Sequence, residues 1–121
     1  MLNKKNRLTS YSAFCATYNN KNSVSNDSII LYAGKLKTNE SCPTRVGFVV
    51  SKKVHKRAVK RNRIKRLIRE NIRLLIKDGC KELERYQSLI FVAKDDVLEK
   101  DFEEIRKMIL TLLQKLANKN I

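Results

Sequence analysis

A run of basic residues between positions 51 and 77 is the part of this sequence best suited to binding chemistry. It holds twelve of the chain's 27 Lys and Arg residues and a single acid, Glu70, and the chain as a whole carries a net charge of +15. Exposed helix faces usually mix charges, whereas Lys65, Arg69 and Arg73 follow one another at intervals of four residues, where like charges repel. A surface that keeps such repulsion is typical of phosphate binding. The run therefore predicts a nucleic-acid partner.

Groups suited to covalent or metal chemistry are sparse. His55 is the single histidine, and it has no second metal ligand and no acid partner beside it. No Ser or Cys is accompanied by a His and a carboxylate that would activate it. One cluster of acids lies near the start of the last predicted helix and comprises Asp95, Asp96, Glu99, Asp101, Glu103 and Glu104. Such a cluster could hold Mg²⁺ as in a metal-dependent nuclease. Acids also gather at a helix N-terminus because the helix dipole favours them. We favour the dipole explanation and predict no catalytic residue and no metal site in this chain.

The basic run also has the period of an amphipathic helix, which we expect over residues 57–77. At about 100° per residue, one broad face is apolar and predicted to be core; it comprises Ile64, Leu67, Ile68, Ile72, Leu75 and Ile76. The opposite face carries Asn62, Arg66, Arg69, Arg73 and Lys77, with Arg61 and Lys65 along one flank. Gly79 is placed to end the helix as its C′ residue. Such a helix would pack through one side and present its cations on the other.

Two further helices and three strands are expected around this helix. A short helix begins at Thr9 or Ser10 and places Phe14 and Tyr18 on one face. Strands are predicted at 28–36, 44–51 and 88–94, the first two antiparallel to each other and the third central and buried on both faces. Residues 19–27 form a polar loop. A last helix opens with the capping pattern at 101–104.

Length and composition predict one nucleic-acid-binding domain over residues 1–121, with residues 1–8 as a basic, flexible leader. The longest apolar runs are far shorter than the roughly 20 residues that span a bilayer. Cys15, Cys42 and Cys80 are odd in number and widely spaced, which indicates reduced thiols in the cytoplasm rather than disulfides or a zinc site.

Residues 58–70 resemble a known family, the protein component of bacterial ribonuclease P. The signature is an Arg-Asn-Arg helix, here residues 61–63, preceded by a strand that ends in Ser-Lys-Lys, here residues 51–53. The segment 6–8, the aromatic residues Phe14 and Tyr18, and the Leu-Tyr strand at 31–32 match as well. The resemblance covers about residues 4–115. It implies an α+β fold, a single-domain α-β-β-β-α-β-α sandwich whose helices pack on a mostly antiparallel sheet with a left-handed β-α-β crossover. Gly47 would lie in the sheet, and a short extra strand would lie within 36–46 or the polar loop.

The resemblance also implies a division of roles. The protein would assist a catalytic RNA that removes the 5′ leader of precursor tRNA, with Mg²⁺ held by the RNA and no obligate protein partner. The residues implied to face the catalytic RNA are Lys53, Arg57, Arg61, Asn62, Lys65, Arg66 and Arg69. Those implied to line a cleft for the single-stranded leader are Phe14, Tyr18 and Tyr32, with Arg45 and Lys52 nearby. Guanidinium groups suit the phosphates of a folded RNA, and aromatic rings suit stacking with a single strand.

Two other functions fit parts of this pattern. A free-standing RNA-binding protein of ribosomal or ribosome-assembly type could use the same basic helix. A helix-turn-helix DNA-binding protein fits less well, because a strand rather than a first helix precedes the basic helix. For Phe14 and Tyr18, the residues alone would predict core packing, and the leader cleft is what the resemblance implies.

Overall fold

The computed structural model describes residues 4–26, 28–38, 42–50, 57–94, 97 and 100–119. After a 3-10 turn at Lys4–Asn6, the elements are α1 (Tyr11–Asn19), β1 (Asn22–Ser25), β2 (Ile29–Ala33), β3 (Arg45–Val50), α2 (Ala58–Lys77), α3 (Lys81–Glu84), β4 (Ser88–Ala93) and α4 (Phe102–Lys119). Apart from the short α3, this is the α-β-β-β-α-β-α order that the resemblance implies. The α+β sandwich is confirmed.

The four strands form one sheet in the order β1-β2-β4-β3. β1 pairs antiparallel with β2 and β2 antiparallel with β4, whereas β3 pairs parallel with β4. The parallel pair is joined through α2, which gives the β-α-β crossover. The strands predicted over 28–36 and 44–51 run antiparallel to each other, as expected, but they are not neighbours, because β4 lies between β2 and β3. This central place suits β4, because its residues from Leu89 to Phe91 are all buried, as expected for a strand covered on both faces.

The prediction that residues 19–27 form a loop is wrong for β1. Asn22–Ser25 pairs along the edge of β2, with Val24 opposite Leu31, and Val24 packs against the core. Its other side chains are polar because an edge strand leaves one side open to water, so the strand has no clear hydrophobic signal. The resemblance allowed an extra strand in this loop, and it correctly placed Gly47 within the sheet.

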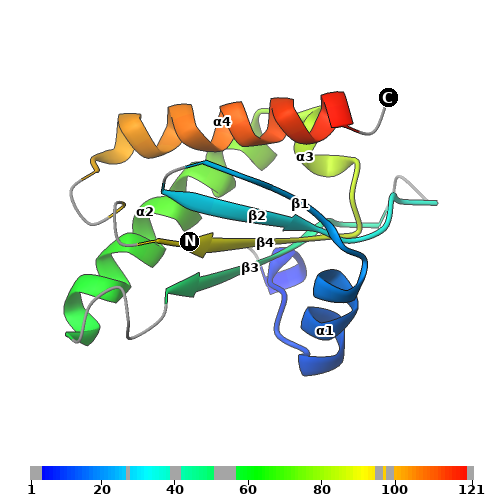
Figure 1. Ribbon diagram of the computed structural model, residues 1–121, viewed down its shortest axis with the longest axis horizontal. Coiled ribbons are helices and arrows are strands. Elements are labelled where there is room, and N and C mark those ends of the chain that lie inside the picture. The colour runs from blue at the N-terminus through cyan, green and yellow to red at the C-terminus, as the bar shows by residue number, and fades with distance from the viewer. Residues whose placement is uncertain are drawn as a thin grey trace.

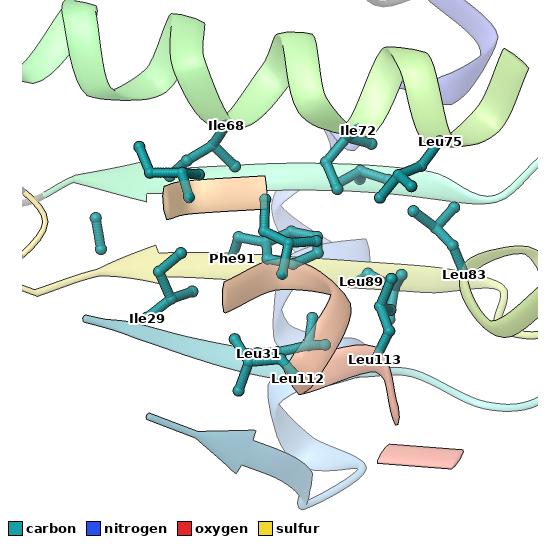
Figure 2. Packing of buried hydrophobic residues seen from close by; sticks show 14 of the residues in the cluster. Ile29, Leu31, Ile68, Ile72, Leu75, Leu83, Leu89, Phe91, Leu112 and Leu113 are labelled. Carbon is teal, nitrogen blue, oxygen red and sulfur yellow. The ribbon is translucent and has the colours of Figure 1, made fainter. Parts of the chain in front are cut away.

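The core lies between the sheet and the two long helices. Figure 1 shows α4 along one side of the sheet and α1 near the opposite side. Ile64, Ile68 and Ile72 of α2 are fully buried, as the helical period predicts. Figure 2 shows Ile68, Ile72 and Leu75 directed from α2 towards the strands, where Phe91 and Leu89 are labelled. Leu112 and Leu113 from α4 complete this layer.

Two predicted helix ends are confirmed. Gly79 follows α2 with φ +73°, a left-handed conformation that suits glycine. Asp101 precedes α4, and its Oδ1 accepts a hydrogen bond of 2.9 Å from the backbone N–H of Glu104. Asp101 therefore acts as an N-cap, which agrees with the dipole explanation for the acids that surround it.

The segment before α1 is attached to the free edge of β3. Arg7 forms a parallel bridge with Val46, and the Leu8 N–H donates to the Val46 carbonyl at 3.0 Å. The Asn6 side chain is buried and donates to the Thr44 carbonyl at 2.9 Å. Residues 6–8, which the sequence assigns to a flexible leader, thus have fixed partners that lead the chain into α1.

Candidate nucleic-acid interface

The first half of α2 positions most of the predicted RNA-facing residues. The buried face fixed by Ile64 and Ile68 sets the rotation of the helix, so the side chains of Asn62 and Arg66 are exposed. Arg61 and Lys65 are half-buried, as expected for residues on the flank of the packed face, and Arg69, predicted on the opposite face, is half-buried as well. Arg57 is exposed and occupies the N-cap position of the helix. Lys53 lies outside the described residues. We call Arg61, Lys65, Arg66 and Arg69 the cation strip.

The only acid in this helix neutralises a cation outside the strip. Glu70 accepts hydrogen bonds from Arg73, with both of its carboxylate oxygens 3.1 Å from the arginine Nε. The bond with Arg73 lowers the pKa of Glu70 below its ordinary value. The other ion pair among the described residues joins Lys100 and Glu104. Within the described part of the chain, the cation strip therefore has no carboxylate partner, and its charge remains for an external anion.

Arg69 is held in place by an aromatic side chain that the sequence analysis did not identify. Its guanidinium carbon lies 5.7 Å from the centre of the Phe48 ring, within range of a cation–π contact. Phe48 in turn stacks on Phe91, with 6.3 Å between the ring centres. The expectation that Arg69 points directly away from the apolar face is wrong, because this contact draws the guanidinium over the edge of β3. No local sequence pattern joins residues 48 and 69.

On the other face of the sheet, α1 crosses three strands in turn. Thr17 lies over β4, where its hydroxyl is 2.6 Å from that of Ser88. Phe14 lies over β3, because a Cβ on Gly47 would be 2.6 Å from Cζ of the phenylalanine. Tyr18 lies over β2 and meets Tyr32 edge to face, with 4.7 Å between ring centres. The missing side chain of Gly47 is what lets α1 approach the sheet this closely.

The three predicted stacking residues are therefore gathered on one side of the domain. Phe14, Tyr18 and Tyr32 are all half-buried, so part of each ring remains accessible. Burial raises the pKa of Tyr18, and the neighbouring Tyr32 raises it further. The Tyr18 phenol therefore stays neutral at physiological pH and would not repel a phosphate backbone.

The sheet continues beyond α1 as an apolar row. One row of register partners across three strands consists of Tyr32, Ile90 and Gly47. A second row, two residues further along each strand, consists of Ile30, Val92 and Val49. Because side chains two apart on a strand share a face, this second row lies on the same face as Tyr32. Its three side chains are half-buried. Together with the rings of α1, they form a surface suited to the faces of unpaired bases.

The two sets of residues meet at a hollow of about 250 Å³. Phe14 and Gly47 contribute to its wall from the aromatic side, and Lys65 and Arg69 contribute from α2. Arg7, from the segment bound to β3, also lines it. A single strand bound along the aromatic side could therefore continue towards the cation strip without leaving the protein surface.

Arg45 is not brought into this arrangement. Arg45 is exposed and lines a separate hollow together with Ala13 and Ala16. These alanines lie on the side of α1 away from Tyr18, so Arg45 does not flank the aromatic residues as the resemblance implied. Lys52 lies outside the described residues.

Within the described residues, no group of three or more His, Cys, Asp or Glu side chains could hold a metal ion. Asp95, Asp96 and Glu99 are outside the described residues. No described helix is long and apolar enough to cross a membrane.

Comparison with known proteins gives a consistent result. The family model described as Ribonuclease P matches residues 2–117. The ribonuclease P protein component of Clostridium botulinum (strain 657 / Type Ba4) is 36% identical over 112 residues, covering 93% of this chain and 95% of that protein. That of Caldanaerobacter subterraneus subsp. tengcongensis is 35% identical over 115 residues, covering 95% and 92%.

Solved structures agree with the fold. The ribonuclease P protein of Staphylococcus aureus superposes with a TM-score of 0.72 at 28% identity, covering 92% of this chain and 94% of that one. The Thermotoga maritima protein gives a TM-score of 0.71 at 20% identity, with 90% and 96% covered, and supports the fold alone. The chain therefore belongs to the ribonuclease P protein family, the protein component of an endoribonuclease complex that processes the 5′ end of tRNA.

Proposed function

We propose that the cation strip of α2 binds the catalytic RNA of ribonuclease P. The observation that carries this proposal is a row of cations without carboxylate partners in the described structure, on a helix whose other face is buried. Arg61, Arg66 and Arg69 present planar guanidinium groups that pair with phosphate through two parallel hydrogen bonds. Arg57, Asn62 and Lys53 extend this interface in the proposal.

The aromatic side of the domain binds the 5′ leader of precursor tRNA. Phe14, Tyr18 and Tyr32 offer ring faces beside an apolar row of the sheet, and stacking of this kind tolerates any base. Lys52, two residues after β3 in the sequence, would contact the leader backbone in the proposal. We retain no leader contact for Arg45, because it lines a separate hollow.

In this arrangement the protein positions the substrate and the RNA carries the reacting groups. Mg²⁺ held by RNA phosphates would supply the metal-assisted hydrolysis that such cleavage uses. The chain would contribute by holding the leader on one side and the catalytic RNA on the other, which brings the cleavage point to a fixed place. Cys15, Cys42 and Cys80 are free thiols, which suits a cytoplasmic location.

Replacing one cation of the strip should weaken RNA binding without unfolding the protein. Arg66→Ala removes an exposed side chain opposite the core, so its thermal unfolding midpoint should stay near that of the wild type. Its affinity for the catalytic RNA should fall, and the slope of log affinity against log salt should become shallower by about one unit or less. Filter binding across a salt series measures both quantities.

Lys107→Ala is the matched control for this prediction. It removes one exposed positive charge from α4, far in sequence from the strip, and changes net charge by the same amount. It should leave the salt slope unchanged. Equal effects of the two variants would show that the RNA responds to net charge alone and that the strip is not the binding site.

Tyr32→Ala should weaken binding of precursor tRNA to the reconstituted holoenzyme while sparing tRNA that has almost no leader. Ile29, Leu31 and Ala33 of the same strand are buried, whereas Tyr32 points to the opposite face, so the core should tolerate the change. Loss of one stacked base should reduce affinity by about fivefold to a hundredfold. The measurement is the dissociation constant for the two substrates.

Tyr32→Phe provides the control, because it keeps the ring and removes only the hydroxyl. It should bind both substrates like the wild type. If Tyr32→Ala weakens both substrates equally, or if it lowers the unfolding midpoint by many degrees, the ring serves packing and the leader binds elsewhere.

A further inference from the structure

Tyr11, the first residue of α1, leaves an unusually large aromatic ring in water. Its exposure is 84%, the highest of the large apolar side chains in the described structure. A single exposed residue of this kind is common and does not by itself indicate a function. The position of Tyr11 relative to the other rings of α1 does indicate one.

Tyr11, Phe14 and Tyr18 follow the spacing i, i+3 and i+7, which places them on one side of the helix. Phe14 contacts the sheet at Gly47 and Tyr18 contacts Tyr32. Seven residues of helix rise about 10.5 Å, roughly the length of three stacked nucleotides at ~3.4 Å each. The three rings thus form a row with Tyr11 at the end opposite Tyr32.

The surroundings of this end of the row favour a nucleic-acid strand. Tyr11 is separated by one residue from Thr9, which lines the hollow that also includes Phe14 and the cations Lys65 and Arg69. A strand that left the cleft at Phe14 through this hollow would pass between the Tyr11 end of α1 and the positive flank of α2. An aromatic ring for the base and cations for the phosphate are the two components of single-strand binding sites.

We propose that Tyr11 stacks with one additional base of the single strand held in the cleft and so extends the leader-binding surface beyond Phe14. The inference rests on the proposed leader cleft. It assigns a fourth ring to that cleft and predicts that longer leaders gain affinity from a contact that Phe14, Tyr18 and Tyr32 do not provide.

The test compares Tyr11→Ala with the wild type in holoenzyme reconstituted with a bacterial ribonuclease P RNA. Affinity is measured for precursor tRNAs whose leaders grow one nucleotide at a time from none to about ten. Tyr11→Ala should bind the leaderless substrate normally and lose affinity by about fivefold or more once the leader reaches the ring. Because Tyr11 and Tyr32 lie at opposite ends of the row, their penalties should begin at different leader lengths.

Two further variants separate stacking from bulk. Tyr11→Phe keeps the ring and should behave as the wild type, whereas Tyr11→Leu keeps an apolar side chain and should lose the same contact as Tyr11→Ala. Unchanged affinity of Tyr11→Ala at every leader length, with Tyr32→Ala still showing its leader-dependent loss, would overturn this inference and leave the proposed function intact. If neither variant shows a leader-dependent loss, the proposed leader cleft itself would be ruled out. A loss on the leaderless substrate, or penalties that begin at the same length, would also overturn the role given to Tyr11.

Discussion

Ile68→Asp should unfold the domain. Ile68 is fully buried in the middle of α2 and packs into the layer shared with Leu89 and Phe91 (Figure 2). The change creates a cavity and places a carboxylate where the surrounding cluster is apolar, which should cost about 4 kcal/mol or more. Small domains are stable by about 5–15 kcal/mol, so most of that stability would be lost. Circular dichroism and chemical denaturation measure the effect.

Arg66→Asp is the matched control, because it introduces the same residue into the same helix two positions away, where the side chain is exposed. It should fold with near-normal stability and bind the catalytic RNA poorly, since it reverses a charge of the cation strip. Ile68→Val, which removes one methylene, should cost only about 0.5–1.5 kcal/mol. A folded Ile68→Asp together with an unfolded Arg66→Asp would mean that α2 is rotated relative to the sheet.

The packing of α2 could be predicted from sequence because a period of 3.6 residues is a local property. The spacing of Ile64, Ile68 and Ile72 is enough to identify the buried face, and all three are buried. β4 was also predicted in its central place, since an almost wholly apolar strand must be covered on both faces. Conversely, the polar strand Asn22–Ser25 has no such signal, because its partner is needed to recognise it.

The candidate site depends more on contacts between distant parts of the chain. The pairing of Arg73 with Glu70 lies within one turn of helix and could have been anticipated; it removes Arg73 from the cations that are left for an RNA partner. The contact of Arg69 with Phe48 and the separation of Arg45 from the rings depend on the order of the strands. The strand order is set by tertiary packing, and the spacing of residues along the chain does not predict it.

Gly47 is the residue on which the aromatic side of the domain most depends. A Cβ built there would approach Phe14 to 2.6 Å at Cζ and 2.8 Å at Cε1, and the side chain of Leu8 to 3.3 Å. Gly47→Val adds two more carbons in that space. We expect the change to displace α1 from β3 and to destabilise the protein by about 3 kcal/mol. Leader-dependent binding of precursor tRNA should be lost with it, because Phe14 and Tyr18 move with the helix.

The cause of this effect can be isolated with a double-mutant cycle in thermal or chemical unfolding. Phe14→Ala removes the ring that meets the new side chain, at a cost of its own because Phe14 is half-buried. If the clash with the ring is the origin of the destabilisation, the double variant should be more stable than the sum of the two single effects predicts, by about 1 kcal/mol or more. Val49→Ala, on the same strand face but two residues away, should show no such coupling with Phe14→Ala. Strict additivity of Gly47→Val and Phe14→Ala would mean that the glycine is needed for the strand itself and not for the approach of α1.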